Sequence, residues 1–335
     1  MNQSKKILIT DYAWATLEPE REVLSAIGAE LIVAETGTEI EFLKYAPDVD
    51  GILTNWAKVT TDVVKAAEKC QVIGRYGIGL DNIDVVTATS LGMVVFNVPT
   101  YCLEEVSDHA MALVLAMARK VPRLNNEVKN RGWDRNIGPQ MYRIRGQKLG
   151  IIGFGKIGQL IVPKAKGFGM EVLAYSPSLT DTVAKVYGVK NVDFEELLTE
   201  SDFITIHCPL VPETSNLINA DALSKMKSTA YLINTARGGV VDHNALFHAL
   251  RENWIAGAGL DVLPDEPPAA DFALLDLDNV IITPHAAFWS DESINDLQIS
   301  AATGILEVLT GKIPEAIVNP EVLQSTKRRF HLIES

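Results

Sequence analysis

Short β-branched runs alternate with stretches of helical length along most of the 335-residue chain, and this alternation constrains the fold more than any other feature. Strands that are separated by helices pair in parallel, with the helices on the faces of the sheet. The first series of predicted strands is KILIT (6–10), ELIVA (30–34), GILTN (51–55), QVIGRY (71–76) and MVVFNV (93–98). The second series is KLGIIG (148–153), MEVLAY (170–175), FITIHC (203–208), AYLINT (230–235), IAGAGLDV (255–262) and NVIITP (279–284).

Two strand series in a chain of this length predict an α/β protein with two doubly wound parallel-sheet domains. We expect a flavodoxin-like substrate-binding domain from residues 1–98 and 292–335, and a Rossmann domain that binds NAD(P) from residues 99–291. The substrate-binding domain is discontinuous because the late amphipathic segment 291–312 is expected to return to it as a helix. Residues 107–136 are predicted to form one long helix between the two series, and residues 324–335 a loosely held tail.

Composition excludes several classes of function. The chain has 30 Lys and Arg against 43 Asp and Glu, a formal net charge of -13, which repels nucleic acids and anionic membrane surfaces. The longest apolar run, Ala110 to Ala118, is about half of a membrane span. Three widely spaced cysteines and an N-terminus without a signal-peptide pattern indicate a cytoplasmic protein with reduced thiols.

The segment KLGIIGFGKIG carries Gly153, Gly155 and Gly158 in the G-x-G-x-x-G spacing, directly after a predicted strand and at the start of a predicted helix. In a dinucleotide site the first glycine permits the tight turn, the second leaves room for the pyrophosphate, and the third lets helix and strand approach. The amides of Gly155, Lys156 and Ile157 would then point at the phosphates, with the helix dipole behind them.

The end of the next strand decides which dinucleotide binds. An acidic residue there would bind the ribose 2′-hydroxyl and select NAD, but Ser176 occupies the position. A serine can donate to a hydroxyl or to a phosphate, and no Arg or Lys follows within several residues to neutralise a 2′-phosphate. We therefore expect NAD as the cofactor, with NADP left open.

Two residues that follow strands of the second series suit hydride transfer to a 2-keto acid. That reaction needs a cation to hold the carboxylate and polarise the carbonyl, and an acid to protonate the oxygen. Arg237 can supply the cation and His285 the acid, with Glu266 fixing the histidine tautomer. Taken alone, Arg237 could be a surface arginine at a turn and His285 a structural histidine. The other histidines show no close ligand set, so we expect no metal site.

The chain resembles the D-isomer-specific 2-hydroxyacid dehydrogenase family from about residue 5 to about residue 320. The motifs RYGIGLDNID, EEVSDHAMALVLAMAR, GIIGFGKIG, HCPLVPET, LINTARGGVVD, GLDVLPDEPP and TPHAA occur in the family's order. DYAW, LTNWAKVT and HAAFWS are most similar to the branch that includes the C-terminal-binding-protein dehydrogenases.

The resemblance implies a role for each of these positions. The catalytic set would be Arg237, Glu266 and His285, and Asp261 would orient the nicotinamide carboxamide. The amides of the substrate loop, Tyr76, Gly77 and Ile78, would share the substrate carboxylate with Arg237. The cofactor cleft would be lined by His207, Cys208, Pro209, Thr214, Thr235 and Ala236.

The resemblance also bears on the partner and the substrate. Family members pack the helix around residues 108–120 against its copy in a homodimer; the alternative is a helix buried in its own domain. Tyr101, in the loop TYCLEE, together with Phe288 and Trp289, predicts a pocket with aromatic bulk, which makes phosphorylated substrates less expected.

We expect an NAD(P)-dependent oxidoreductase that transfers a hydride between nicotinamide and C2 of a small 2-keto or 2-hydroxy acid, D-specific by resemblance, in a cleft between the two domains. The alternative is an NAD(H)-sensing dimeric binding module of the C-terminal-binding-protein type. Turnover of a 2-keto acid would distinguish the two.

Overall fold

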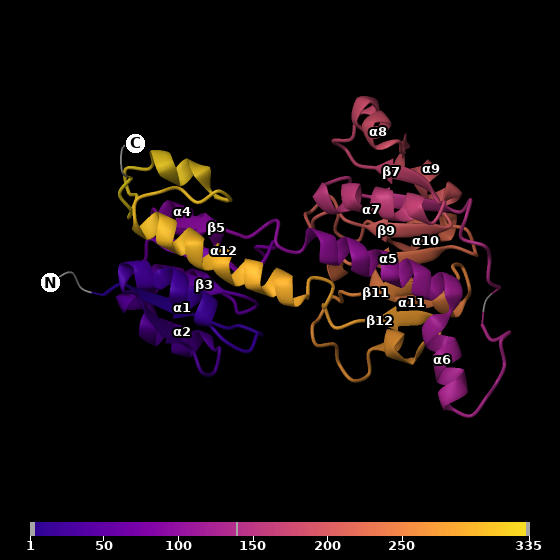
Figure 1. The fold of residues 1–335 in the computed structure, drawn as a ribbon, viewed down its shortest axis with the longest axis horizontal. Coiled ribbons are helices and arrows are strands. Elements are labelled where there is room, and N and C mark those ends of the chain that lie inside the picture. The colour runs from indigo at the N-terminus through magenta and orange to yellow at the C-terminus, as the bar shows by residue number, and fades with distance from the viewer. Residues whose placement is uncertain (1–3, 139, 333–335) are drawn as a thin grey trace. The chain divides into compact units, whose positions relative to one another are not determined.

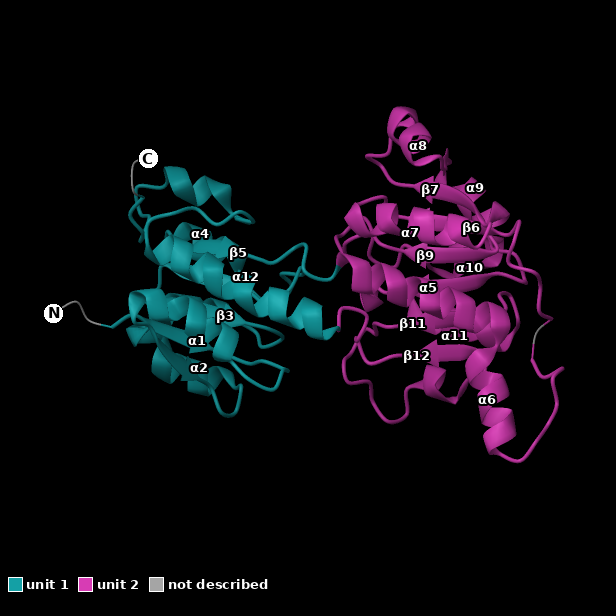
Figure 2. Ribbon diagram, viewed as in Figure 1, with its two compact units in different colours: residues 1–102, 290–335 teal, residues 103–289 magenta. Residues whose placement is uncertain are grey.

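The computed structural model describes residues 4–138 and 140–332. Contacts between residues divide the chain into two compact units, which Figure 2 shows in two colours. Unit 1 comprises residues 1–102 and 290–335, and unit 2 comprises residues 103–289. Both are α/β units built on a parallel sheet, which confirms the predicted fold class.

Unit 1 contains a five-stranded parallel sheet in the order β2-β1-β3-β4-β5, which is the flavodoxin-like order. Its strands are β1 (Lys6–Ile9), β2 (Glu30–Val33), β3 (Gly51–Thr54), β4 (Val72–Arg75) and β5 (Val94–Phe96). Its α-helices are α1 (Glu18–Leu24), α2 (Glu39–Tyr45), α3 (Thr61–Ala66), α4 (Val85–Ser90) and α12 (Asp291–Leu309). All four residues of the central strand β3 are buried, as expected for a parallel strand covered on both faces.

Helix α12 packs against α1 and β4, although more than 200 residues separate it from each of them in the chain (Figure 1). A capping box starts the helix, because the Ser290 side chain accepts the amide of Ser293 while the Ser293 hydroxyl accepts the amide of Ser290. Gly304 allows α12 to approach β5 closely as well, since a Cβ there would lie 2.3 Å from the Phe96 ring.

The segment after α12 also belongs to unit 1. Asn319 donates to Met93 O and accepts the amide of Val95. Further on, Phe330 is buried, and the Arg329 guanidinium donates to Ala67 O at 2.6 Å. The prediction of a loosely held tail was therefore wrong for the described residues up to 332, because one aromatic ring and one guanidinium fix the segment to the sheet layer.

Unit 2 contains a seven-stranded parallel sheet in the order β12-β11-β10-β9-β6-β7-β8, the Rossmann order with one more strand at the edge. Its strands are β6 (Lys148–Ile152), β7 (Glu171–Tyr175), β8 (Lys190–Asn191), β9 (Phe203–Ile206), β10 (Tyr231–Asn234), β11 (Gly257–Leu260) and β12 (Val280–Ile282). Its α-helices are α5 (Leu103–Arg119), α6 (Val121–Lys129), α7 (Lys156–Gly167), α8 (Asp181–Tyr187), α9 (Phe194–Glu200), α10 (Ala220–Lys225) and α11 (His243–Arg251). The strand order reverses between β6 and β9, and ligands of such sheets bind beyond the carboxyl ends of the strands at this point.

The predicted single long helix is wrong, because the structure has two helices there. Helix α5 ends at Arg119 and α6 begins at Val121, and Figure 1 shows α6 running at an angle to α5. Lys120 between them has a left-handed φ of 51°. Pro122 lies in the first turn of α6, where its missing N–H is tolerated, whereas inside a continuous helix it would remove a hydrogen bond and clash with the preceding turn. Beyond Lys129, the residues that the structure describes are not helical again until α7.

Among the described residues, no helix combines the length and the apolar character that crossing a bilayer requires.

Candidate active site

The turn between β6 and α7 is shaped by its glycines. Gly153 has a φ of +91°, and a Cβ on it would lie 2.6 Å from the amide nitrogen of Cys208. A Cβ on Gly158 would lie 2.5 Å from Gly153 O, so only a glycine at this position lets the helix come so close to the turn that follows the strand. Gly155 precedes the helix and makes no side-chain cap, and a Cβ there would meet nothing within 4 Å. Open space therefore adjoins the first amides of α7, as a pyrophosphate group requires.

Apart from Asp261, which follows β11, the other predicted cofactor residues follow β7, β9 and β10 at the same edge of the sheet. Ser176 comes directly after β7, and its Oγ lies 3.3 Å from Ser178 Oγ. Burial lowers the pKa of His207 to about 3, so its ring is neutral, with Nε2 2.7 Å from Thr205 Oγ1. Burial also raises the pKa of the half-buried Cys208 thiol.

Two threonines at this edge of the sheet differ in their hydrogen bonds. The hydroxyl of Thr214 donates to Pro209 O at 2.6 Å and closes the loop after β9. Thr235 follows β10, and its buried Oγ1 has no hydrogen-bond partner anywhere in the part of the chain that the structure describes. A buried hydroxyl without a partner costs free energy, and a polar group of a bound ligand can remove that cost. The residues of this edge therefore fit a dinucleotide.

Glu266 and His285 form the most direct contact among the predicted catalytic residues. Nδ1 of His285 lies 2.6 Å from Oε2 of Glu266, and the amide of Leu263 donates to Oε1 at 2.9 Å. Burial raises the pKa of Glu266, but the hydrogen bond and charge of His285 and the charge of Arg237 outweigh it, so the pKa is lowered overall. The two side chains are 34% and 29% exposed, which leaves them accessible to a small ligand.

Arg237 lies in the loop that follows β10, against the loop that carries Glu266. Its Nη1 donates to Ala236 O at 2.8 Å. The next residue, Gly238, lies so close to the Glu266 loop that a Cβ would be 2.1 Å from the carbonyl carbon of Leu263. Together with the influence of Arg237 on the Glu266 pKa, this contact shows that the structure brings the guanidinium, carboxylate and imidazole together in unit 2.

Sequence reasoning missed Asn234, the last residue of β10. Its side chain is fully buried, its Nδ2 donates to Arg237 O at 2.9 Å, and its Oδ1 accepts the amide of Ala236 at 3.0 Å. These two bonds fold the strand end into the turn that presents Arg237. An asparagine at the end of an otherwise apolar strand was the available signal, since a buried amide requires partners.

Asp261 fixes the loop that carries His285. Its carboxylate has no exposed surface and accepts hydrogen bonds from three groups of that loop, the Thr283 hydroxyl and the amides of Ala286 and Ala287. His285 itself has a left-handed φ of 51°, and its amide donates to Asp261 O at 2.8 Å. Nε2 of His109, on α5, lies 2.9 Å from Thr283 Oγ1 and extends the network. His109 was not among the predicted site residues.

Phe288 lies beside His285. Its ring centroid is 6.2 Å from that of His285 in an edge-on arrangement, and the Trp289 ring follows at 5.8 Å from Phe288. Trp289 is exposed. Aromatic bulk is therefore present on the imidazole side of unit 2.

The remaining predicted substrate residues, Tyr76, Gly77, Ile78 and Tyr101, belong to unit 1, and the first three form the turn after β4. The amide of Tyr76 donates to Thr54 O at 2.8 Å and extends the pairing of β3 with β4. Tyr76 therefore contributes to the loop through its ring, because its amide is committed to the sheet. The amide of Gly77 donates to Arg75 O at 3.0 Å.

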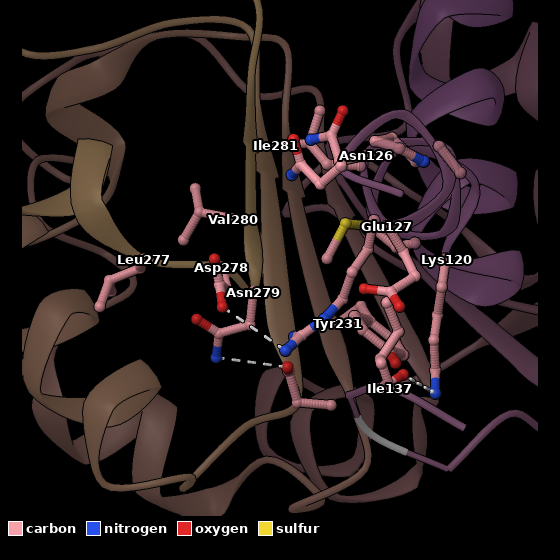
Figure 3. Close-up of a pocket in the computed structure, with 16 residues that line it drawn as sticks. Lys120, Asn126, Glu127, Ile137, Tyr231, Leu277, Asp278, Asn279, Val280 and Ile281 are labelled. Atoms are coloured by element: carbon pink, nitrogen blue, oxygen red, sulfur yellow. Dashed lines mark hydrogen bonds and ion pairs between the residues drawn. The ribbon is translucent and has the colours of Figure 1, made fainter. Parts of the chain in front are cut away.

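A pocket of about 420 Å³ lies at the opposite edge of the unit 2 sheet (Figure 3). Tyr231 and Val280, which line it, are the first residues of β10 and β12, whereas the predicted catalytic residues follow the carboxyl ends of their strands. Lys120 lies on its wall and donates to Ile137 O at 2.8 Å. None of the predicted site residues lines this pocket.

Within residues 4–138 and 140–332, no group of three or more His, Cys, Asp or Glu side chains is arranged to hold a metal ion. His243 and His248 both lie on α11.

Comparison with known proteins identifies the family. Residues 111–287 match the family model described as "D-isomer specific 2-hydroxyacid dehydrogenase, NAD binding domain". The chain belongs to the D-isomer-specific 2-hydroxyacid dehydrogenase family. It is 42% identical to the D-3-phosphoglycerate dehydrogenase of Methanocaldococcus jannaschii over 94% of this chain, but it spans only 59% of that protein. It is 41% identical to the glyoxylate reductase of Korarchaeum cryptofilum, over 85% of this chain and 86% of the relative.

Solved structures support the same assignment. The D-lactate dehydrogenase of Aquifex aeolicus, solved with NAD and lactic acid, superposes with a TM-score of 0.83 at 27% identity and covers 99% of this chain and 100% of its own. Unit 2 therefore contains the NAD-binding domain of this dehydrogenase family. Membership of the C-terminal-binding-protein-like branch stays a prediction.

Proposed function

We propose that the protein transfers a hydride between NAD(H) and C2 of a small, unphosphorylated 2-keto or 2-hydroxy acid, with the D isomer as the hydroxy acid. The observation that carries this proposal is the 2.6 Å contact between Glu266 and His285, next to the loop that presents Arg237. A guanidinium, a carboxylate and an imidazole beside a dinucleotide-binding turn are the groups that this reaction requires.

Each group has one task in the reduction of the keto acid. The Arg237 guanidinium binds the carboxylate and polarises the C2 carbonyl. His285 gives the proton on Nε2 to the carbonyl oxygen, because its Nδ1 is held by Glu266. Glu266 stabilises the imidazolium before the transfer and keeps the ring in place after it. In oxidation the neutral His285 takes the proton back from the hydroxyl.

Bound NADH would supply the hydride that arrives at C2. On the protein side, Gly153 permits the turn, Gly155 leaves room beside the first amides of α7, and the Thr235 hydroxyl is free to bond a polar group of the ligand. Ser176 can bond the ribose 2′-hydroxyl. We propose NAD as the preferred cofactor because no Arg or Lys follows Ser176 within several residues to neutralise a 2′-phosphate.

The proposed substrate class rests on the aromatic side chains. The Phe288 ring beside His285 and the Trp289 ring next to it offer apolar surface rather than cations to a substrate side chain. A short, uncharged side chain suits this surface, and a phosphate ester does not.

A substrate panel tests the proposal. NADH oxidation is measured with glyoxylate, pyruvate, hydroxypyruvate and 3-phosphohydroxypyruvate, and NADPH replaces NADH in a parallel series. We expect the highest kcat/KM with an unphosphorylated acid and NADH. Preference for the phosphorylated acid would contradict the substrate class. Tight NADH binding without turnover of any keto acid would favour the NAD(H)-sensing binding module instead.

We also propose a homodimer that involves the helix around residues 108–120. The apolar side of α5 is already buried in its own unit, where Ala110 and Val114 are covered. A second copy would therefore use the other side of α5 and the following α6, where Val121 and Val128 are 57% and 48% exposed. Sedimentation equilibrium of the wild type and of Val121→Asp checks this, and a monomeric wild type would contradict it.

A further inference from the structure

Unit 1 contains a buried carboxylate that the proposed chemistry does not use. Glu20, on α1, has no exposed surface. Its Oε1 accepts the hydroxyl of Tyr76 at 3.0 Å, and its Oε2 accepts Nε2 of Gln298, on α12, at 2.7 Å. The same Nε2 donates to Thr16 O at 2.8 Å. Burial raises the pKa of Glu20, which shows that the site disfavours the charged form.

Tyr76 connects this carboxylate to the substrate loop. Its ring is 1% exposed and packs edge-on against Trp14, with ring centroids 4.8 Å apart. The amide of Tyr76 makes the last hydrogen bond between β3 and β4, to Thr54 O. The chain turns immediately afterwards at Gly77, whose φ is +128°. The hydroxyl bond to Glu20 therefore fixes the side chain of the first residue in the turn.

The rest of the turn is held through its carbonyl oxygens. Gly77 O accepts the amide of Val98 at 3.1 Å, and Ile78 O accepts Nδ2 of Asn97 at 2.8 Å. The loop is thus fastened at the Tyr76 ring on one side and at two carbonyls on the other. Of these three fastenings, only the Tyr76 hydroxyl bond depends on an ionisable group.

Stability alone gives a weak reason for a carboxylate in this place. Replacing a buried ionic or hydrogen-bonded group by a well-packed apolar one is often neutral or even stabilising. A carboxylate that accepts bonds from two different segments instead sets where those segments lie, here the turn after β4 and helix α12. Its directed bonds suit a task that depends on accurate geometry.

We propose that Glu20 is a positioning residue for substrate binding: by holding the Tyr76 hydroxyl, it fixes the turn at residues 76–78, in which the amide of Ile78 would receive the substrate carboxylate. The inference rests on the proposed function, because the turn matters only where a 2-keto acid binds. Glu20 does not touch the substrate and acts through Tyr76. Loss of the bond should therefore weaken substrate binding more than it slows the chemical step.

Three variants separate this role from general stability. Glu20→Met fills the same space without an acceptor, Tyr76→Phe removes the donor and keeps the ring, and Glu20→Gln keeps an acceptor oxygen. We expect KM for the best 2-keto acid to rise about 10-fold in Glu20→Met and Tyr76→Phe, with kcat within about threefold and the NADH Kd unchanged. The double variant should be no worse than the single ones, and Glu20→Gln should return KM to near the wild-type value.

Glu41→Met is the matched control. Glu41 is a second buried carboxylate of unit 1, and it accepts the amides of Glu35 and Thr36, away from the turn after β4. This control should lower the urea midpoint and leave KM unchanged. Tyr76→Phe removes a single oxygen, so it keeps the test valid if Glu20→Met fails to fold.

The possible failures are distinguishable. Normal wild-type turnover with KM unchanged in Tyr76→Phe, or with the same KM rise in Glu41→Met, overturns this inference and leaves the proposed function standing. A wild-type protein that turns over no 2-keto acid overturns the proposed function, and the inference falls with it.

Discussion

Oε2 of Glu266 lies 2.6 Å from Nδ1 of His285, so the second ring nitrogen, Nε2, is the one that can exchange a proton with a substrate. The pKa of Glu266 is lowered overall, because the hydrogen bond from His285 and nearby positive charge outweigh the effect of burial. Glu266 is therefore ionised across the neutral range and can support the imidazolium.

The two reaction directions should respond to pH in opposite ways. Reduction requires protonated His285 and oxidation requires the neutral ring, so kcat/KM should fall with rising pH in reduction and increase with rising pH in oxidation. Initial rates with NADH and keto acid, and with NAD and hydroxy acid, check this. His285→Gln should lower both by about 10²–10⁴-fold, the usual contribution of general acid–base catalysis. Identical profiles in the two directions would remove His285 from this role.

Arg237→Ala should abolish the clamp on the substrate carboxylate. We expect kcat/KM for the keto acid to fall by about 10²–10³-fold, since one electrostatic contact to the reacting group is lost. The NADH Kd, measured by fluorescence titration, should hardly change. Arg251→Ala is the control, because Arg251 lies over the Phe247 ring on α11, apart from the catalytic loops. Full turnover in Arg237→Ala would refute the clamp.

Asp261→Asn should disturb the loop that presents His285. The carboxylate accepts one loop amide on each oxygen, from Ala286 and from Ala287, and an asparagine amide nitrogen cannot accept either. One buried N–H left without a partner costs about 1–3 kcal/mol of unfolding free energy. Misplacement of the imidazole should lower kcat by about 10²-fold. A variant with wild-type kcat in stopped-flow assays would show that the loop holds its shape without Asp261.

Gly153→Ala and Gly155→Ala should separate folding from cofactor binding. At Gly153 the left-handed φ costs at least about 1–2 kcal/mol for any other residue, and the Cβ would also press on the Cys208 amide. At Gly155 a Cβ meets no protein atom within 4 Å, so stability should be unchanged while the NADH Kd increases. Urea unfolding and NADH titration of both variants provide the test. Unchanged NADH affinity in Gly155→Ala would place the pyrophosphate elsewhere.

Acid should destabilise unit 1 partly through Glu41. Hydrogen bonds from the Thr36 side chain and from the amides of Glu35 and Thr36 lower its pKa from 4.5 to about 2. A depressed folded-state pKa contributes stability above the unfolded-state pKa, and this contribution is lost as the pH falls through the folded-state value. Between about pH 4.5 and pH 2, Glu41→Gln should therefore lose less stability than the wild type. If the free energy of unfolding falls equally in Glu41→Gln and in the wild type over this pH range, the role assigned to Glu41 is contradicted.

Features with a local cause could be predicted from the sequence. The turn at Gly153 was predictable because a glycine spacing, a strand before it and a helix after it all depend on residues within one short segment. His285 and Glu266 were predicted as partners although 19 residues separate them, because both follow strands whose carboxyl ends meet at one edge.

Several features were missed, and only some of them depend on tertiary contacts. Strand β8 has only the two residues Lys190 and Asn191, and so it carries no periodic pattern. Lys120 breaks the long helix in a conformation that lysine rarely adopts, and Pro122 was the overlooked signal. The roles of Asn234 and Glu20 depend on partners that only the folded chain supplies.

The discontinuous make-up of unit 1 sets an order for biosynthesis. Unit 2 is a single stretch of chain, whereas the sheet of unit 1 is covered by α12 and held by Asn319 and Arg329, which a ribosome makes after unit 2. Domains fold as units while the nascent chain emerges. Unit 2 should thus reach its native form before unit 1 can, and the early-made strands of unit 1 must wait, incompletely covered, until the segment that begins at Ser290 has been made.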